Sequence, residues 1–232
     1  MKNTPPLLLC IDTTEKSCSA CVARGSVELA RRRTNETYKH SETLGPFVRD
    51  LLLEAGLELG DLSGIVINKG PGSYTGLRVG FAFAKALSFA SGVPILGVNA
   101  LEALADNQAS KMDFDLCLPM MDARRMEVYT AVYDRNLKEI EPPYPLVLDQ
   151  EFFDREVFRG KSVAMVGSGA AKTTHFKLAE NFLSETFDND ASYLIKPGIK
   201  RIQEGKVEDT AYFEPLYLKE ARITQPKQTL RS

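Results

Sequence analysis

Two aspartates, Asp12 and Asp122, each end an apolar run that is typical of a buried strand. A carboxylate at such a strand end could hold magnesium-bound water, and small or hydroxyl-bearing neighbours would let backbone N–H groups approach phosphate oxygens. Thr13 and Thr14 follow Asp12, and the small-residue turn Gly167, Ser168 and Gly169 could accommodate a nucleotide in the second half. Neither aspartate has a glycine in the turn that follows it. The pattern therefore predicts a vestigial nucleotide-binding site made of these residues.

The surroundings of the two aspartates recur at an offset of 110 residues, from 12 to 122. A turn at 24–26 precedes a strand from Val27 in the first half, and a turn at 134–136 precedes a strand from Leu137 in the second. Duplication explains this, and so do the common lengths of β-hairpins. We favour duplication, which predicts an α/β protein of two related lobes with mixed sheets flanked by helices, the actin, sugar kinase and Hsp70 (ribonuclease H-like) architecture. The expected lobes are 1–110, which would bind a partner, and 111–232, which ends in a C-terminal tail.

Hydrophobic patterning predicts the elements that position these residues. Strands are expected at 7–11, 17–23 and 27–31 as an antiparallel meander, and again at 65–67 and 93–98. Helices are expected at 44–55 and 74–91, each followed by a glycine. Strands that alternate with helices imply parallel pairing after the meander.

The predicted helix at 74–91 has only two charged side chains, Arg78 and Lys85, so more than one of its faces must be covered. Every fourth residue from Gly72 to Ser88 is small, and such a stripe allows another helix to approach closely. That helix could be 44–55 of the same chain or a helix of another subunit. We favour both together, with two helix pairs forming a four-helix interface. The predicted partner-binding residues are Leu44, Phe47, Val48, Leu51, Gly72, Tyr74, Thr75, Gly76, Leu77, Gly80, Phe81, Ala84 and Ser88.

The sequence does not contain the residue patterns of several other kinds of site. The glycine-rich loop at 70–76 has neither the Gly-Lys-Ser/Thr ending of a Walker loop nor the dinucleotide fingerprint. Cys18 and Cys21 have the spacing of a metal knuckle, but a second pair is missing and a strand would point them to opposite faces. The two histidines, His40 and His175, are far apart in the sequence. No metal site is predicted.

The composition restricts the function further. The chain has 232 residues, with 29 Lys and Arg against 31 Asp and Glu. Proteins that bind nucleic acid unaided usually have a basic surplus, so this balance disfavours that function. The segment from Lys219 is locally basic and could contact RNA or be a solvated tail. Four cysteines are too few for a disulfide framework, and we find no signal peptide or membrane-spanning pattern. We therefore expect a soluble cytoplasmic protein that does not bind membranes.

Five motifs occur in order along the chain: Leu-Cys-Ile-Asp-Thr-Thr (9–14), Gly-Pro-Gly-Ser-Tyr-Thr-Gly-Leu-Arg-Val-Gly (70–80), Met-Asp-Ala-Arg with Glu-Val-Tyr (121–129), Gly-Ser-Gly-Ala (167–170) and Glu-Pro-Leu-Tyr-Leu (214–218). Together they resemble the TsaB (YeaZ) family of bacterial tRNA threonylcarbamoyladenosine biosynthesis proteins over essentially the whole chain. The loop at 70–80 is the most specific of them. Met126 stands where the family usually has glycine, so we expect no nucleotide contact at that turn.

The resemblance implies a paralogue of TsaD, the catalytic threonylcarbamoyltransferase, without TsaD's pair of metal-binding histidines. It implies no catalytic residue and no tightly bound cofactor in this chain. The helices at 44–55 and 74–91 would bind TsaD as a heterodimer. The assembled complex would recruit the ATPase TsaE, use ATP and magnesium, and modify adenosine 37 of tRNAs reading codons that begin with A.

Two other functions stay open at this point. One is a stand-alone ATP-binding kinase or ATPase of the same fold that uses Asp12 and Asp122. The other is a zinc glycoprotease, against which the lack of zinc ligands in the sequence argues. The sequence also leaves open whether the chain forms a homodimer through the same surface when its partner is absent.

Overall fold

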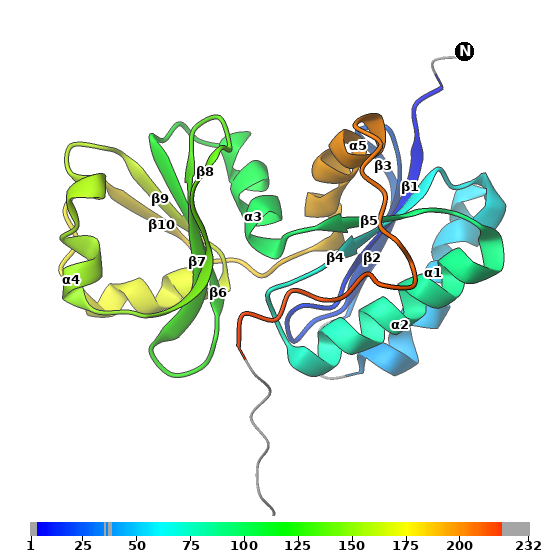
Figure 1. Cartoon of the computed structure of the whole chain (residues 1–232), viewed down its shortest axis with the longest axis horizontal. Helices are drawn as coiled ribbons and strands as arrows, with labels where there is room; N and C mark the ends of the chain where they lie inside the picture. The colour runs from blue at the N-terminus through cyan, green and yellow to red at the C-terminus, as the bar shows by residue number, and fades with distance from the viewer. Residues whose placement is uncertain (1–3, 35, 37–38, 220–232) are drawn as a thin grey trace, which may run out of the picture.

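The computed structural model describes residues 4–34, 36 and 39–219, and Figure 1 shows two five-stranded sheets side by side. The first sheet has the strand order β3-β2-β1-β4-β5. Its first three strands form the predicted antiparallel meander, and β4 and β5 join in parallel. The strands are β1 (Leu7–Asp12), β2 (Ser19–Arg24), β3 (Val27–Arg33), β4 (Gly64–Asn68) and β5 (Ile95–Val98).

The second sheet repeats the first. Its strand order, β8-β7-β6-β9-β10, has the same connectivity, with an antiparallel meander followed by two parallel strands. The strands are β6 (Leu116–Asp122), β7 (Glu127–Asp134), β8 (Glu139–Val147), β9 (Val163–Val166) and β10 (Phe182–Glu185). Asp12 ends β1 and Asp122 ends β6, as predicted. The architecture of two related lobes is confirmed.

One face of the first sheet is covered by α1 (His40–Ala55), which begins four residues before the predicted helix, and α2 (Tyr74–Ser91), which has the predicted bounds. The two helices lie side by side on this face (Figure 1). Ser73 caps α2, because its Oγ accepts a hydrogen bond from the N–H of Gly76 at 3.3 Å. Gly92 ends the helix in the left-handed conformation, with φ 73°. Apolar side chains of both helices and of the sheet form one core.

The opposite face of the first sheet is covered by segments from much later in the chain. The turn η4 (Ala191–Leu194) and the helix α5 (Ile195–Gln203) pack on β1, β4 and β5. A further helix, α3 (Ala100–Ala109), lies between the two sheets (Figure 1), with Ala103 in the core of the first lobe and Leu104 in that of the second. The predicted boundary at residue 110 stays a prediction. The two sheets separate near it, whereas residues beyond 190 return to the first lobe.

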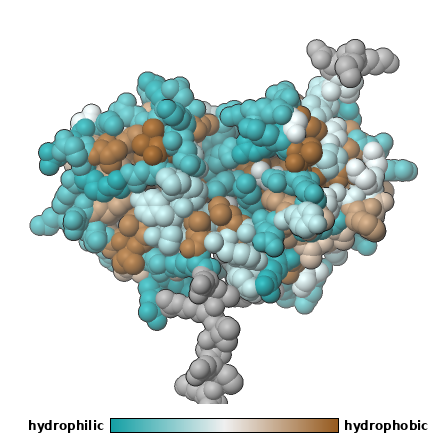
Figure 2. Space-filling view, viewed as in Figure 1, coloured by the Kyte–Doolittle hydropathy of each residue, from teal (hydrophilic) through white to brown (hydrophobic). Residues whose placement is uncertain are grey.

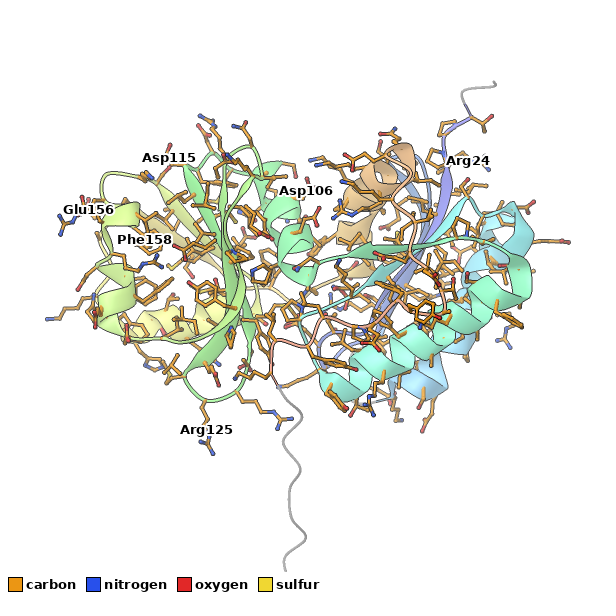
Figure 3. The ribbon with its side chains drawn as sticks, viewed as in Figure 1. Arg24, Asp106, Asp115, Arg125, Glu156 and Phe158 are labelled. Carbon is orange, nitrogen blue, oxygen red and sulfur yellow. The ribbon has the colours of Figure 1, made fainter. Side chains whose placement is uncertain are left out.

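The second lobe buries a cluster of aromatic rings under its outer face. The ring of Phe182 makes edge-on contacts with Phe153 and Phe158, with ring centroids 5.9 Å and 5.7 Å apart, which is a preferred geometry for such pairs. Figure 3 shows Phe158 at this position. The covering elements are α4 (Gln150–Phe153) and the turns η2 (Glu156–Phe158) and η3 (Ser168–His175); the first lobe has a comparable short turn, η1 (Leu59–Asp61).

Residues 208–219, here called the C-terminal strap, run along α2 and reach the second lobe (Figure 1). Glu208 forms a bridge to Ile95 at the edge of β5. Phe213 then stacks on Phe81 of α2, with ring centroids 4.7 Å apart. At its end, Lys219 forms an ion pair with Glu127 of β7. Residues 220–232, most of the predicted basic tail, lie outside the described residues. In the part of the chain that the structure describes, no helix is long and apolar enough to cross a membrane.

The glycines of α2 face the turn between β1 and β2. A Cβ atom on Gly76 would lie 2.0 Å from the carbonyl oxygen of Thr13, and one on Gly80 would lie 2.3 Å from the Thr13 hydroxyl. A Cβ on Gly72 would lie 2.5 Å from the carbonyl oxygen of Thr14. Real Cβ atoms do not approach other heavy atoms this closely, so these positions need glycine for the approach of the turn.

Glu15, in the same turn, joins the two lobes. Its carboxylate accepts a hydrogen bond from the hydroxyl of Ser168 in the second lobe and another from the N–H of Asn189 at 2.6 Å. Burial raises the pKa of Glu15 to about 7, although both hydrogen bonds oppose the shift. Nearby, Arg31 and Arg33 form ion pairs with the buried Asp190. The junction between the lobes is therefore polar and sensitive to charge.

Replacing Gly76 by alanine is expected to lower the free energy of unfolding by at least about 1–3 kcal/mol, because the methyl group would force the Thr13 carbonyl away from α2. Urea denaturation measures this. Gly60→Ala is the control, because a Cβ there meets nothing within 4 Å. Equal stability of the Gly76 variant and the unmodified chain would show that the close approach is not needed.

Glu15 should make the protein less stable as the pH rises. The pKa is about 7 in the folded chain and near 4.5 in the unfolded chain, so the folded state holds a proton that the unfolded state loses between these values. The stabilisation is present below about pH 4.5 and lost as the pH rises through about 7.

The free energy of unfolding of the unmodified chain, taken relative to a Glu15→Gln variant, should fall by roughly 1–3 kcal/mol between about pH 5 and about pH 8. Glutamine mimics the protonated carboxyl group and does not titrate. The control is Glu180→Gln, at an exposed glutamate. A difference that does not change with pH would contradict the assignment.

Candidate functional site

Asp12, the first predicted site residue, is buried in the turn that it shapes. Its side chain is 2% exposed, and its Oδ1 accepts hydrogen bonds from the N–H of Thr14 at 2.9 Å and from the Thr14 hydroxyl at 2.8 Å. The side-chain amide of Asn68 donates to its other oxygen. Burial raises the pKa of Asp12, and these three hydrogen bonds offset part of the rise. The carboxylate therefore orders the turn and does not face an open site.

The hydroxyl-bearing turn after Asp12 is closed by α2. Thr13 and Thr14 are both buried. The Thr14 carbonyl accepts a hydrogen bond from the N–H of Ser73 at 2.6 Å, and the glycines of α2 cover the rest. A phosphate group would have to displace the N-terminal turn of α2 to reach these backbone groups.

Asp122, the counterpart of Asp12, lies on the surface. Partial burial acts to raise the pKa of Asp122, but the hydrogen bonds from the Lys172 ammonium and the Arg124 N–H outweigh it, and the pKa is lowered. The N–H of Asp122 donates to the Ser168 hydroxyl at 3.0 Å. Asp122 is thus held by its own lobe, as Asp12 is held by the first.

The small-residue turn of the second lobe is also occupied. The Ser168 hydroxyl donates to the Glu15 carboxylate of the first lobe. A Cβ on Gly167 would lie 2.5 Å from the Met120 carbonyl oxygen, and Gly169 packs against Val128 and Met120. The Glu15 carboxyl group therefore occupies the position in front of the turn where a phosphate would bind. The residues present do not fit a nucleotide.

The described residues contain no group of three or more His, Cys, Asp or Glu side chains placed to hold a metal ion. Cys10, Cys18, Cys21 and Cys117 are all buried as free thiols. Cys18 and Cys21 lie in the first lobe's core regions on opposite sides of the sheet, in agreement with the expected alternation of their side chains.

The predicted partner-binding stripe requires a correction. Its small residues face the β1–β2 turn and the C-terminal strap of the same chain, so they have no free surface for a partner helix. Among the predicted residues, only Phe47, Tyr74 and Thr75 keep substantial exposed side-chain surface. The structure buries Leu44, Val48, Leu51, Gly76, Leu77, Gly80, Phe81, Ala84 and Ser88.

The opposite side of α2 is apolar and exposed. We call it the outer face of α2; it consists of Val79, Ala82, Phe83, Ala86, Phe89 and Ala90. Phe89 is 91% exposed, and Leu53 of the neighbouring α1 is 79% exposed. Figure 2 shows apolar atoms along the side of the first lobe where α2 lies. An exposed apolar patch of this kind is typical of a protein-binding surface.

The sequence analysis missed this face although its signal is present. Ala82, Ala86 and Phe89 follow the helical spacing of three and four, as the small stripe does. The small-residue stripe was predicted to bind the partner because glycines permit close packing of helices. They do not reveal whether a helix or a backbone turn makes the approach.

The family described as TsaD, tRNA N6-adenosine threonylcarbamoyltransferase, matches residues 34–207. The tRNA threonylcarbamoyladenosine biosynthesis protein TsaB of Bacillus subtilis (strain 168) is 33% identical over 180 residues, which cover 76% of each chain. TsaB of Escherichia coli (strain K12) is 32% identical over 134 residues, 56% of this chain and 55% of that protein.

Solved structures share the fold. YeaZ from Pseudomonas aeruginosa superposes with a TM-score of 0.81 at 23% identity, over 92% of this chain and 100% of that one. The ethanolamine utilization protein EutJ from Carboxydothermus hydrogenoformans superposes with a TM-score of 0.50 at 11% identity, over 86% of this chain and 91% of that one. The repeated lobes, the motif at 70–80 and these matches lead to one conclusion: the chain belongs to the TsaB (YeaZ) family of tRNA threonylcarbamoyladenosine biosynthesis proteins, paralogous to TsaD.

Proposed function

We propose that this chain is a non-catalytic subunit that binds and activates a TsaD-type threonylcarbamoyltransferase. The reaction is the formation of N6-threonylcarbamoyladenosine at position 37 of tRNAs reading codons that begin with A. The observation that carries the proposal is the outer face of α2, where an almost uncharged helix leaves apolar side chains in water. Burial of such surface gains roughly 25 cal/mol per Å², so a matching partner would stabilise the exposed face.

The match to the TsaD family supports a TsaD-type partner. The matched residues, 34–207, include both α1 and α2, so a TsaD-type protein is expected to have a similar helix pair in the same place. Two similar helix pairs can meet about a pseudo-two-fold axis and bury their apolar faces as a four-helix interface. A second copy of this chain carries the same face, so a homodimer would compete when the partner is absent.

The turn after Asp12 and the turn at 167–169 are both occupied by groups of the chain itself, which supports a non-catalytic role for this chain within the assembly. Asp12 accepts hydrogen bonds within its own turn, and the Glu15 carboxylate accepts one from Ser168, so neither turn is open to a nucleotide. ATP and magnesium would be used by the assembled complex, which would include a TsaE-type ATPase and would hold tRNA. We place the assembly in the cytoplasm.

Replacing Ala82 by arginine should raise the Kd for a TsaD-type subunit by roughly 5- to 150-fold. Ala82 is exposed in the free chain, so the monomer should fold normally, whereas a long charged side chain would overpack the helix contact at a cost of about 1–3 kcal/mol. Titration calorimetry with the purified partner measures the Kd.

Ala171→Arg is the matched control, because Ala171 is an exposed alanine in η3 of the second lobe. It should bind the partner as the unmodified chain does. Undiminished binding by the Ala82 variant would refute the outer face as the docking surface. Gly80 is unsuitable for this test, because any side chain there would meet Thr13 and disturb the fold itself.

A further inference from the structure

A row of alternating cations and aromatic rings begins at the N-terminal end of α2. The guanidinium of Arg78 lies 4.2 Å from the ring centroid of Tyr74. The Tyr74 ring packs on Tyr217 of the C-terminal strap, with centroids 4.9 Å apart. Tyr74 and Tyr217 are 37% and 39% exposed, so both rings present part of their surface to solvent.

The row continues onto the second lobe. Lys219 follows Tyr217 in the strap, and its ammonium lies 5.5 Å from the ring centroid of Tyr129. Arg124 is exposed in the turn between β6 and β7, the strand that carries Tyr129. Figure 1 shows the end of the strap, this turn and the start of α2 at the same edge of the molecule. We call Arg78, Tyr74, Tyr217, Lys219, Tyr129 and Arg124 the cation–ring track.

The track has a local surplus of positive charge in a chain that has a slight negative net charge overall. Within the described residues, Arg78 and Arg124 form no ion pair, and neither do the nearby exposed Lys16 and Arg125. Figure 3 shows Arg125 projecting from this edge. The acidic neighbours Asp122 and Glu127 are paired, with Lys172 and Lys219 respectively.

Partly exposed rings with cations beside them fit one class of ligand best. Single-stranded nucleic acid stacks its bases on aromatic rings and places its phosphates against Lys and Arg. An acidic protein surface would use the cations but would leave the rings without a function. The balanced overall charge is suited to a contribution within an assembly, since strong unaided binding needs a larger basic surplus.

We propose that the cation–ring track binds a single-stranded segment of RNA. The choice of RNA rests on the proposed function, in which the assembly modifies tRNA. The track lies beyond the N-terminal end of the outer face of α2, so RNA and a TsaD-type subunit can be bound through different residues.

The test is fluorescence anisotropy of labelled oligouridylate with the purified full chain at low salt. Tyr217→Leu should weaken binding about fivefold or more, because it removes a stacking surface. A second variant, with Arg124→Asn and Arg125→Asn, changes residues outside the strap. Both arginines have positive φ, 70° and 49°, which asparagine tolerates. This variant should reduce the slope of log affinity against log salt by roughly 1–2.

Two controls match these changes. Tyr212→Leu replaces a tyrosine of the same strap that is 83% exposed and makes no ring contact among the described residues. Arg24→Gln removes an exposed arginine at the opposite edge of the molecule (Figure 3). Both should bind RNA as the unmodified chain does.

Three results would overturn the proposal: no binding of the RNA, equal weakening by the controls, or weakening by the arginine changes with full affinity in the Tyr217 variant. The last would leave an electrostatic surface without stacking, as for an acidic protein. The assay contains no partner subunit, so its failure is separate from failure of the proposed docking, which the Ala82 variant tests without RNA.

Discussion

The contact between the Thr13 carbonyl and Gly76 determines how the first lobe is built. It brings the β1–β2 turn directly against α2, at a distance that only glycine permits. The small-residue side of the helix is therefore buried by contacts within the same chain. Because α2 has almost no charged residues, its other side must meet water or a partner. The exposed apolar side of α2 is thus the side that the packing of the turn leaves uncovered.

The same contact closes the place where related folds would admit phosphate. The turn that would offer its N–H groups is buried under α2, and Asp12 is occupied in shaping that turn. At the other lobe, Glu15 fills the position before Ser168 and ties the lobes together. Both turns are thus occupied by groups of the chain itself, and the contacts of Glu15 form part of the junction between the lobes.

Much of the fold could be predicted from the sequence. Continuous apolar runs that end at Asp12 and Asp122 indicated the strands and their repetition, and Gly56 and Gly92 indicated where two helices end. The return of α5 to the first sheet could not be predicted, because a short amphipathic helix does not reveal which distant sheet it covers. The path of the C-terminal strap could not be predicted either, because an irregular segment does not reveal which element it packs against.

The sequence drew attention to α2, and the binding of a partner there stays a prediction. A stripe of glycines shows only that some other group comes close to the helix. Close approach of a backbone turn and close approach of a helix both require a small side chain. The sequence therefore could not distinguish contact with Thr13 from contact with a partner helix. Only the three-dimensional arrangement shows that the outer face is the one left free.

The most direct test of this account is the reactivity of a cysteine at Ala86, on the outer face of α2. The four native cysteines are buried, so the thiol of an Ala86→Cys variant would be the accessible one. The account predicts rapid modification by a thiol reagent in the free chain and strong protection by a saturating TsaD-type subunit, with an Ala171→Cys control reacting equally in both states. Equal reactivity of the Ala86→Cys thiol with and without the partner would contradict it.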